Sequence, residues 1–163
     1  MDMDSLVPKP YITADYASHN GMNGDNINDI YVDGGDRIWL ANYPAGVTIR
    51  NNRYQSYEWF RHSPGNSRSL VNDQVHDVIE DSEGDLWFAT SNGISLLQPA
   101  VGRWRSFLSR SDGIQDGGNH IFLTLCEVSP GVICAGGYAS GLYRIEKKTG
   151  RVEYFPPSFA EVV

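Results

Sequence analysis

The sequence lacks the features of several common classes of protein. No stretch approaches the ~20 consecutive apolar residues that a membrane-spanning helix needs. No segment shows apolar residues at helical spacing over the length of a stable helix. Positive charge is also scarce, because 13 Lys and Arg face 20 Asp and Glu, which gives a formal net charge of −7. Nucleic acid and anionic membrane surfaces are therefore not expected as partners, since binding to phosphate needs a basic face.

Cysteine is nearly absent, and two residues, Cys126 and Cys134, are too few for a disulfide framework. If their segments form a hairpin, the two thiols lie opposite each other. They would then either form a cross-strand disulfide in an oxidising compartment or pack as small buried apolar residues, and we favour the second interpretation.

A secretion signal is not evident either. The first residues, Met1 to Ser5, are acidic and lead into no apolar segment, so we expect no signal peptide. Either the protein is cytosolic or this N-terminus lies inside a longer exported chain.

What the sequence does contain suits a small β protein. The chain has 163 residues, the size of one domain, and its 40% hydrophobic and 12% aromatic residues suffice for a packed core. Seventeen Gly and eight Pro indicate many turns. This composition favours an all-β fold over a helical one.

An internal repeat decides the architecture. The segment Ile27–Asp33 aligns with Val75–Asp81, 48 residues later, and the same spacing places Ile38–Ala41 on Leu86–Ala89 without a gap. A spacing of 46 extends the match to a third unit and places Trp87 on Ile133. Recurrence at a fixed period of this length is the mark of a repeat fold.

Each unit holds four short β-prone runs separated by turn residues. In the middle unit the runs are Val75–Glu80, Leu86–Ala89, Ile94–Leu97 and Trp104–Phe107. Four antiparallel strands per ~48 residues is typical of a β-propeller blade. We therefore predict an all-β partial β-propeller with three four-stranded antiparallel blades at residues 22–68, 69–115 and 116–155. Within residues 1–21, Pro10–Thr13 is predicted to be the outer strand of a preceding blade, and 156–163 form a tail.

Three blades do not close a ring, because closed propellers need about four to eight. The first and last sheets would each leave an apolar face uncovered. The predicted partners are therefore the remaining blades of a larger propeller or a second copy of the chain.

The middle unit also resembles a known family. Val75–Ile94 contains an apolar strand, an Asp-Ser-Glu-Gly turn, a Leu-Trp pair, a Thr, and a Gly followed by an apolar residue. This pattern resembles the two-component regulator propeller repeat, and the likeness extends from Met22 to Phe155. It is weakest in the third unit, where Glu127–Ile133 lacks both Asp and Trp.

The resemblance implies a location and a role. Such propellers form the extracytoplasmic sensor region of hybrid histidine kinase/response-regulator proteins, and many respond to oligosaccharides from polysaccharide breakdown. It thus implies a periplasmic, ligand-sensing segment that is not itself an enzyme, with a histidine kinase elsewhere in the parent protein. A protein-interaction scaffold without a small-molecule site is the alternative. A lyase is a third reading, since some lyases share related repeats.

Ligand-binding residues are expected on one rim, where the loops between second and third strands meet the connections between blades. Aromatic rings with planar polar neighbours suit carbohydrate or peptide recognition, although ordinary solvated loops would have the same composition. The candidates are Tyr43, Asn92, Tyr138, Arg61, His62 and Arg110, with Asp112 and His120 nearby.

Other conspicuous residues have structural interpretations. Trp39 and Trp87 are expected in the core between blades. The acidic cluster Asp81, Glu83 and Asp85 is expected to serve its turn rather than calcium.

On the outer strands, Trp59, Arg103 and Trp104 are expected to pack, with a contact to a neighbouring domain as the alternative. The four histidines, His19, His62, His76 and His120, show no metal-ligand spacing, so no metal, cofactor or catalytic residue is predicted.

Overall fold

The computed structural model describes residues 21–110 and 119–157. Within them, twelve strands form three antiparallel sheets of four strands, and each sheet follows chain order. Blade 1 contains β1 (Ile27–Val32), β2 (Arg37–Asn42), β3 (Gly46–Asn51) and β4 (Ser56–Phe60). Blade 2 contains β5 (Val75–Glu80), β6 (Leu86–Thr90), β7 (Gly93–Gln98) and β8 (Arg103–Phe107). Blade 3 contains β9 (Phe122–Ser129), β10 (Val132–Gly137), β11 (Gly141–Glu146) and β12 (Val152–Phe155).

These sheets confirm the predicted three-blade, all-β architecture. A short 3-10 turn, Pro99–Val101, joins β7 to β8. The strand predicted at Pro10–Thr13 lies outside the described residues. In the described part of the chain, no helix has the length and apolar character to cross a membrane.

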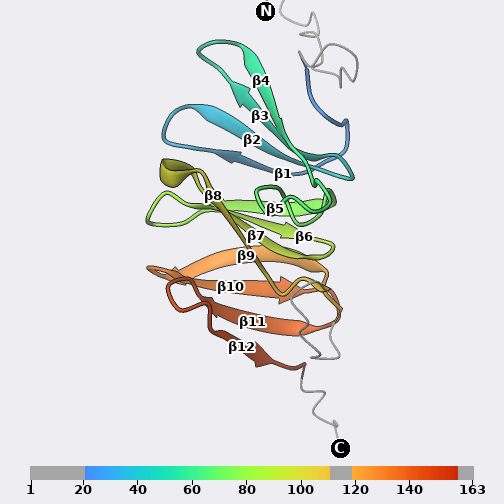
Figure 1. The fold of residues 1–163 in the computed structure, drawn as a ribbon, viewed down its shortest axis with the longest axis vertical. Coiled ribbons are helices and arrows are strands. Elements are labelled where there is room, and N and C mark those ends of the chain that lie inside the picture. Colours follow the sequence, from blue (N-terminus) through green and yellow to red (C-terminus); the bar gives the residue numbers. More distant parts are fainter. Residues whose placement is uncertain (1–20, 111–118, 158–163) are drawn as a thin grey trace, which may run out of the picture.

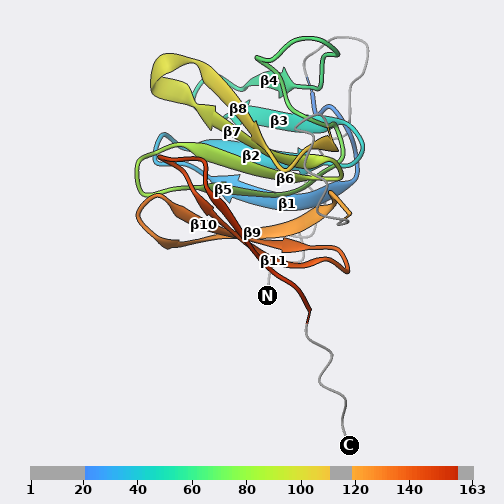
Figure 2. The ribbon, with the colours of Figure 1, turned by 60° about the horizontal axis from the view of Figure 1, so that its bottom comes forward.

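The three sheets stack face against face in chain order, with blade 2 in the middle (Figure 1). The turned view shows β4 and β8 on the same side of this stack (Figure 2). The first strands of successive blades are neighbours. Asp29 Oδ2 on β1 accepts the backbone N–H of Val78 on β5 at 3.0 Å. Asp77 Oδ2 on β5 in turn accepts the N–H of Leu125 on β9 at 2.6 Å. The first strands thus line one side of the stack, as the inner strands of a propeller do.

Two apolar seams hold the blades together. Trp39 on blade 1 is 1% exposed and packs in the first seam, and Trp87 on blade 2 is 0% exposed and packs in the second. Large aromatic rings contribute most of the buried apolar area in such layers. Both tryptophans are therefore core residues, as predicted. The first seam also contains Ala41, Val47, Ile49, Leu70, Val75, Val78, Leu86, Phe88 and Leu97. The second contains Ala89, Ile94, Leu96, Phe107, Leu108, Phe122, Leu125, Ile133, Ala135, Tyr143 and Ile145.

In the third blade, the observed register differs by one residue from the alignment predicted from the sequence. The inner-strand bonds fall on Val78 and Leu125, which are 47 residues apart, not 46. In this register Cys134, not Ile133, takes the place of Trp87, because Cys134 pairs with Cys126 as Trp87 pairs with Ile79. Since side chains alternate between the faces of a sheet, a slip of one residue moves every side chain to the opposite face. Ile133 therefore packs toward blade 2.

The two cysteines lie opposite each other on β9 and β10, as predicted for a hairpin. Cys126 is exposed and Cys134 is half-buried, and both are free thiols. The prediction that both are buried is therefore wrong. They lie on the face of blade 3 that points away from blade 2, and no described blade covers this face.

Each blade has a loop end and a turn end, which lie at opposite ends of its strands. The loop end consists of the loops 43–45, 91–92 and 138–140, the connection 61–74, and the described parts of the next connection, 108–110 and 119–121. The turn end holds the other hairpin turns. Glycine begins the third strand at the loop end of each blade. Gly46 has φ 82°, and a Cβ there would meet the carbonyl oxygen of Phe60, so no other residue fits well. Its N–H donates to the Asp73 carbonyl at 2.7 Å, which fastens the third strand to the inter-blade connection.

Candidate functional site

The loop between β2 and β3 carries Tyr43 to the seam between blades 1 and 2. Its ring centroid lies 5.6 Å from that of His76 on β5. His76 Nε2 lies 2.8 Å from Ser91 Oγ, and its Nδ1 lies 3.4 Å from Asn28 Nδ2. Burial lowers the pKa of His76, which favours the neutral imidazole. The result is a polar cluster of phenol, imidazole, hydroxyl and amide groups.

His76 was missed as a rim residue because its position depends on a β-bulge. The pairing of β5 with β6 shifts between Val75 and Asp77, and that of β1 with β2 shifts between Ile27 and Asp29. Each shift leaves one extra residue, His76 or Asn28, in the inner strand. The matching spacing of Asn28 and His76 in the repeat was the only signal, and it did not reveal a bulge.

The other predicted rim residues follow in blades 2 and 3. The N–H of Arg110 donates to Asn92 Oδ1 at 3.3 Å. Tyr138 has 56% of its surface exposed, and its backbone is fixed on both sides. Its N–H donates to the Ile121 carbonyl at 2.8 Å, and its carbonyl accepts from Asn119 Nδ2 at 2.6 Å.

Arg61 and His62 begin the connection from blade 1 to blade 2. Arg61 forms an ion pair with Asp73 at 3.5 Å, and the N–H of His62 donates to the same carboxylate at 2.5 Å. His62 Nδ1 lies 2.8 Å from the Leu70 carbonyl. Of the two nearby candidates, His120 Nδ1 lies 2.8 Å from the Leu108 carbonyl, and Asp112 lies outside the described residues.

The structure thus places all six predicted residues at the loop end, but in separate groups rather than in one pocket. Tyr43 contacts His76, Asn92 contacts Arg110, and Arg61 and His62 share Asp73. Tyr138 lies in the equivalent loop of blade 3. Their role in binding remains a prediction.

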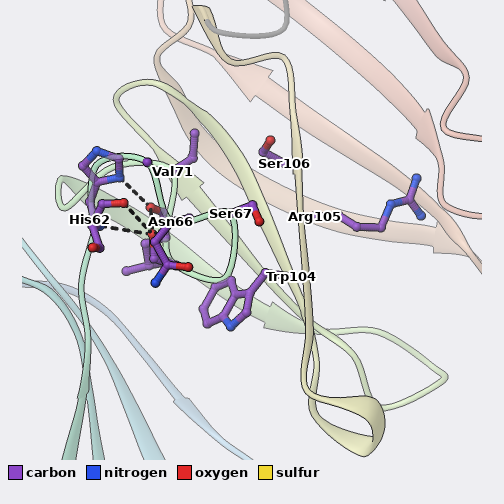
Figure 3. Close-up of a pocket in the computed structure, with 11 residues that line it drawn as sticks. His62, Asn66, Ser67, Val71, Trp104, Arg105 and Ser106 are labelled. Carbon is purple, nitrogen blue, oxygen red and sulfur yellow. Dashed lines mark hydrogen bonds between the residues drawn. The ribbon is translucent and has the colours of Figure 1, made fainter.

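Of these residues, His62 lines a pocket of about 400 Å³ between the connection 61–74 and strand β8 (Figure 3). Figure 3 shows the Trp104 indole directed toward the loop that carries Asn66, whereas Arg105 points to the other side of β8. The described lining is hydroxyl-rich and contains no carboxylate. It consists of His62, Ser63, Gly65, Asn66, Ser67, Ser69, Leu70, Val71, Trp104, Arg105 and Ser106.

Hydrogen bonds within the connection shape this pocket. Ser69 Oγ donates to the Asn66 carbonyl at 2.9 Å, and the Ser63 N–H donates to Ser69 Oγ at 3.1 Å. Trp104 packs edge-on against Phe60 at 5.3 Å, which confirms its predicted packing role. An aromatic wall with uncharged hydroxyl and amide groups suits a neutral polar ligand. Sequence analysis missed Asn66 and Ser67, because a Ser-rich connection looks like an ordinary loop.

The acidic cluster of Asp81, Glu83 and Asp85 lies at the turn end and binds a lysine of the next blade. Ligand atoms of Asp81, Glu83 and Asp85 lie within 4.8 Å of one another. The ammonium of Lys147, from blade 3, lies 2.6, 2.7 and 2.7 Å from these three carboxylates. The space between the carboxylates is thus filled by a side chain of the protein itself.

The predicted turn role of Asp81 is confirmed by its contacts. Its Oδ1 accepts the N–H groups of Glu83 and Asp85 at 3.0 Å, and its Oδ2 accepts from Trp87 Nε1 at 2.8 Å. Burial alone would raise the pKa of Asp81, but hydrogen bonds from Lys147, Trp87 and the turn lower it. Burial alone would likewise lower the pKa of Lys147, but its three carboxylate partners raise it.

Taken with the fold, these contacts define the class of protein as a partial β-propeller. Residues 69–92, which include the first two strands of blade 2, match the family described as two component regulator propeller. The resemblance predicted from the sequence is therefore confirmed for the middle repeat. No curated protein matches the chain.

Solved structures share the architecture. The extracellular domain of the hybrid two-component system BT3049 from B. thetaiotaomicron matches 89% of this chain with 23% identity and a TM-score of 0.76. The extracellular domain of the hybrid two-component system BT4673 from the same organism matches 87% with 21% identity and a TM-score of 0.66. PorZ, a surface component of the type-IX secretion system of Porphyromonas gingivalis, matches 80% with 12% identity and a TM-score of 0.60.

The chain covers only part of these proteins. It spans 20% of the BT3049 chain, 18% of the BT4673 chain and 21% of the PorZ chain. At these identities the likeness establishes the propeller fold.

Proposed function

We propose that this chain is a ligand-sensing propeller segment of a hybrid two-component sensor, located outside the cytoplasm. One observation carries the proposal. The middle repeat matches the two component regulator propeller family, and the three-blade stack superimposes on the extracellular domain of a hybrid two-component system. The same comparison supports a periplasmic location and a histidine kinase elsewhere in the parent protein.

The loop end is the proposed ligand site, and the proposed ligand is an oligosaccharide. Tyr43 and Tyr138 place phenol rings in equivalent loops of blades 1 and 3, where fold packing does not require an aromatic residue. The hydroxyl-rich pocket beside Trp104 adds donors and acceptors without a negative charge. Amphipathic rings with planar amides and hydroxyls recognise sugars by stacking and hydrogen bonding.

The proposed macromolecular partner is a further blade of the same propeller, or a second copy of the chain, on the outer face of blade 3. Val47 and Ile94 each follow the first glycine of a third strand, and both are 0% exposed beneath the next blade. Leu142 has the same position in blade 3, yet 43% of its surface is exposed. The same position is therefore buried by the next blade in blades 1 and 2 and exposed in blade 3, and this exposed apolar face is where a further blade or a second copy would pack.

Isothermal titration with neutral oligosaccharides, such as xylohexaose and cellohexaose, tests the sensing role. We expect saturable binding that Tyr43→Ala or Tyr138→Ala weakens at least tenfold. Tyr54→Ala is the matched control, because Tyr54 is 73% exposed in the turn between β3 and β4, at the opposite end. Equal losses for all three variants, or no saturable binding, would contradict an oligosaccharide site at the loop end.

A protein-interaction scaffold is the second candidate. The fold similarity to PorZ, a component of a secretion system, favours it. An ectodomain that binds no oligosaccharide but captures a defined protein of its own secretion or signalling complex would support this alternative.

A further inference from the structure

A second pocket lies at the turn end, in the seam between blades 2 and 3. It has a volume of about 400 Å³, and the residues that line it come from both blades. The turn end lies at the opposite end of the strands from the proposed ligand site, and the two pockets share one lining residue, Arg105. Its side chain points away from Trp104 and the loop-end pocket (Figure 3). The lining consists of Glu83, Gln98, Arg103, Arg105, Pro130, Gly131, Val132, Glu146, Lys147 and Lys148.

Four cations and two carboxylates line this pocket, although the protein as a whole is acidic. Lys147 forms ion pairs with Asp81, Glu83 and Asp85, so its charge is not available to a further anion. Glu146 accepts a hydrogen bond from the Thr149 hydroxyl at 2.7 Å. Both lining carboxylates, Glu83 and Glu146, therefore already have partners within the protein.

The remaining three cations are Arg103, Arg105 and Lys148. Within residues 21–110 and 119–157, none of them has a carboxylate oxygen within 4.0 Å of its charged nitrogens. Arg103 and Arg105 are two residues apart on β8, so they share one face of the strand. Lys148 reaches the pocket from the turn after β11. Three cations thus gather at one seam, and no described carboxylate forms an ion pair with them.

Arg105 is held in place with most of its donors unused. Its Nη1 donates to the Lys147 carbonyl at 2.8 Å, and its guanidinium lies over the Phe107 ring at 4.8 Å from the centroid. A guanidinium has five N–H donors in a fixed plane, a geometry that matches the oxygens of carboxylate, sulfate or phosphate. An ordered arginine with spare donors is therefore prepared to bind an oxyanion.

We propose that this pocket binds an oxyanion group, with Arg105 as the fixed donor and Arg103 and Lys148 as the flanking cations. The group belongs either to a free inorganic anion or to an acidic substituent on a larger ligand. In both cases the group that meets the three cations is the same, either a planar carboxylate or a tetrahedral sulfate or phosphate. Since the pocket is formed by two blades, its occupant also bridges them and stabilises their contact.

The experiment is a titration followed by amide NMR, with sodium sulfate at constant ionic strength maintained by sodium chloride. We expect saturable shifts at Gly131, Val132 and Lys148, and at least fivefold weaker binding in Arg103→Gln and in Lys148→Gln. Both side chains are exposed, so these variants should remain folded. Arg53→Gln removes one exposed charge at a turn of blade 1 and is the matched control, which should bind sulfate as the wild type does.

A parallel titration with a chondroitin 4-sulfate disaccharide and with its unsulfated form separates the two sources. Tighter binding of the sulfated disaccharide than of free sulfate would assign the pocket to a larger acidic ligand, and the reverse would assign it to the free anion. Shifts that grow linearly and spread over all surface cations, or equal losses in Arg53→Gln and Arg103→Gln, would overturn the proposal. The loop-end tyrosine variants should leave sulfate binding unchanged, so this test can fail without affecting the proposed function.

Discussion

The ammonium of Lys147 in blade 3 lies 2.6 Å from Oδ2 of Asp81 in blade 2, and both residues are about 5% exposed or less. Asp81 in turn accepts the indole N–H of Trp87, so the turn, the core tryptophan and the next blade share one carboxylate. In blade 1 the equivalent Asp33 uses Arg37 of its own turn, at 2.7 Å, instead of a residue from the next blade. Lys147 therefore joins blades 2 and 3 through its ion pairs with the carboxylates of blade 2.

Lys147→Met should cost about 3 kcal/mol of unfolding free energy, because it leaves the buried carboxylates of Asp81 and Asp85 without their counter-charge. Urea unfolding followed by tryptophan fluorescence measures the change. Lys148→Met is the matched control, since Lys148 is exposed, and it should change stability by no more than about 0.5 kcal/mol. Equal effects of the two variants would show that the seam charge does not stabilise the fold.

Asp81 should make folding sensitive to acid. Its pKa is lowered in the folded state, so its contribution to stability is present above about pH 3.9, the ordinary value, and is lost as the pH falls through the lower folded pKa. Asp81→Asn should flatten the dependence of unfolding free energy on pH between about 2 and 5. Urea titrations at several pH values measure the slope. Asp36→Asn, at an exposed turn position, should keep the wild-type slope.

Asp77 should act in the opposite direction. Burial raises its pKa and the nearby Asp29 carboxyl adds to the effect, although the Leu125 N–H partly offsets them. Its contribution to stability is therefore present below about pH 3.9 and is lost as the pH rises through the raised folded pKa. Asp77→Asn should consequently gain stability relative to the wild type from pH 4 toward pH 7.

Asp29→Asn provides the internal check, because it removes the neighbouring charge but leaves Asp77 buried. It should reduce, without abolishing, the pH dependence that Asp77 causes. If Asp77→Asn and the wild type respond to pH in parallel, the inner-strand carboxylates do not interact as described.

Tyr31 should ionise well above the ordinary pKa of a tyrosine, which is about 10. Burial and the Glu80 carboxylate, which accepts its O–H at 2.6 Å, raise the pKa of Tyr31 to about 12. Glu80→Gln should lower this pKa toward 10, and NMR of the tyrosine Cζ carbons measures it. The resonance of Tyr54, which is distant and exposed, should not change between the two proteins. An unchanged Tyr31 pKa would contradict the bond between blades 1 and 2.

The sequence predicted the blades because apolar runs and turn residues recur together. Trp39 and Trp87 repeat at a fixed spacing with the Asp that accepts each indole N–H, so their burial could be inferred without coordinates. The third blade was misaligned by one residue because it lacks both the Asp and the Trp. Without them, the bulges that shift the pairing of β9 and β10 leave no visible mark in the sequence.

The sites were predicted less completely, because they depend on contacts between blades. Tyr43 could be placed on a rim, but its contact with His76 arises only when two blades stack. Lys147 belongs to none of the motifs that the repeat revealed, yet its ammonium binds the acidic cluster of the preceding blade. Long-range contacts of this kind follow from geometry that no local pattern encodes.

The most direct test of the proposed function is amide NMR of the protein titrated with a panel of neutral oligosaccharides. Saturable shifts confined to residues 43–45, 61–74, 91–92, 108–110, 119–121 and 138–140 would agree with a ligand-sensing propeller that binds at its loop end. Saturable shifts confined to the turn end, or none with any oligosaccharide, would contradict it.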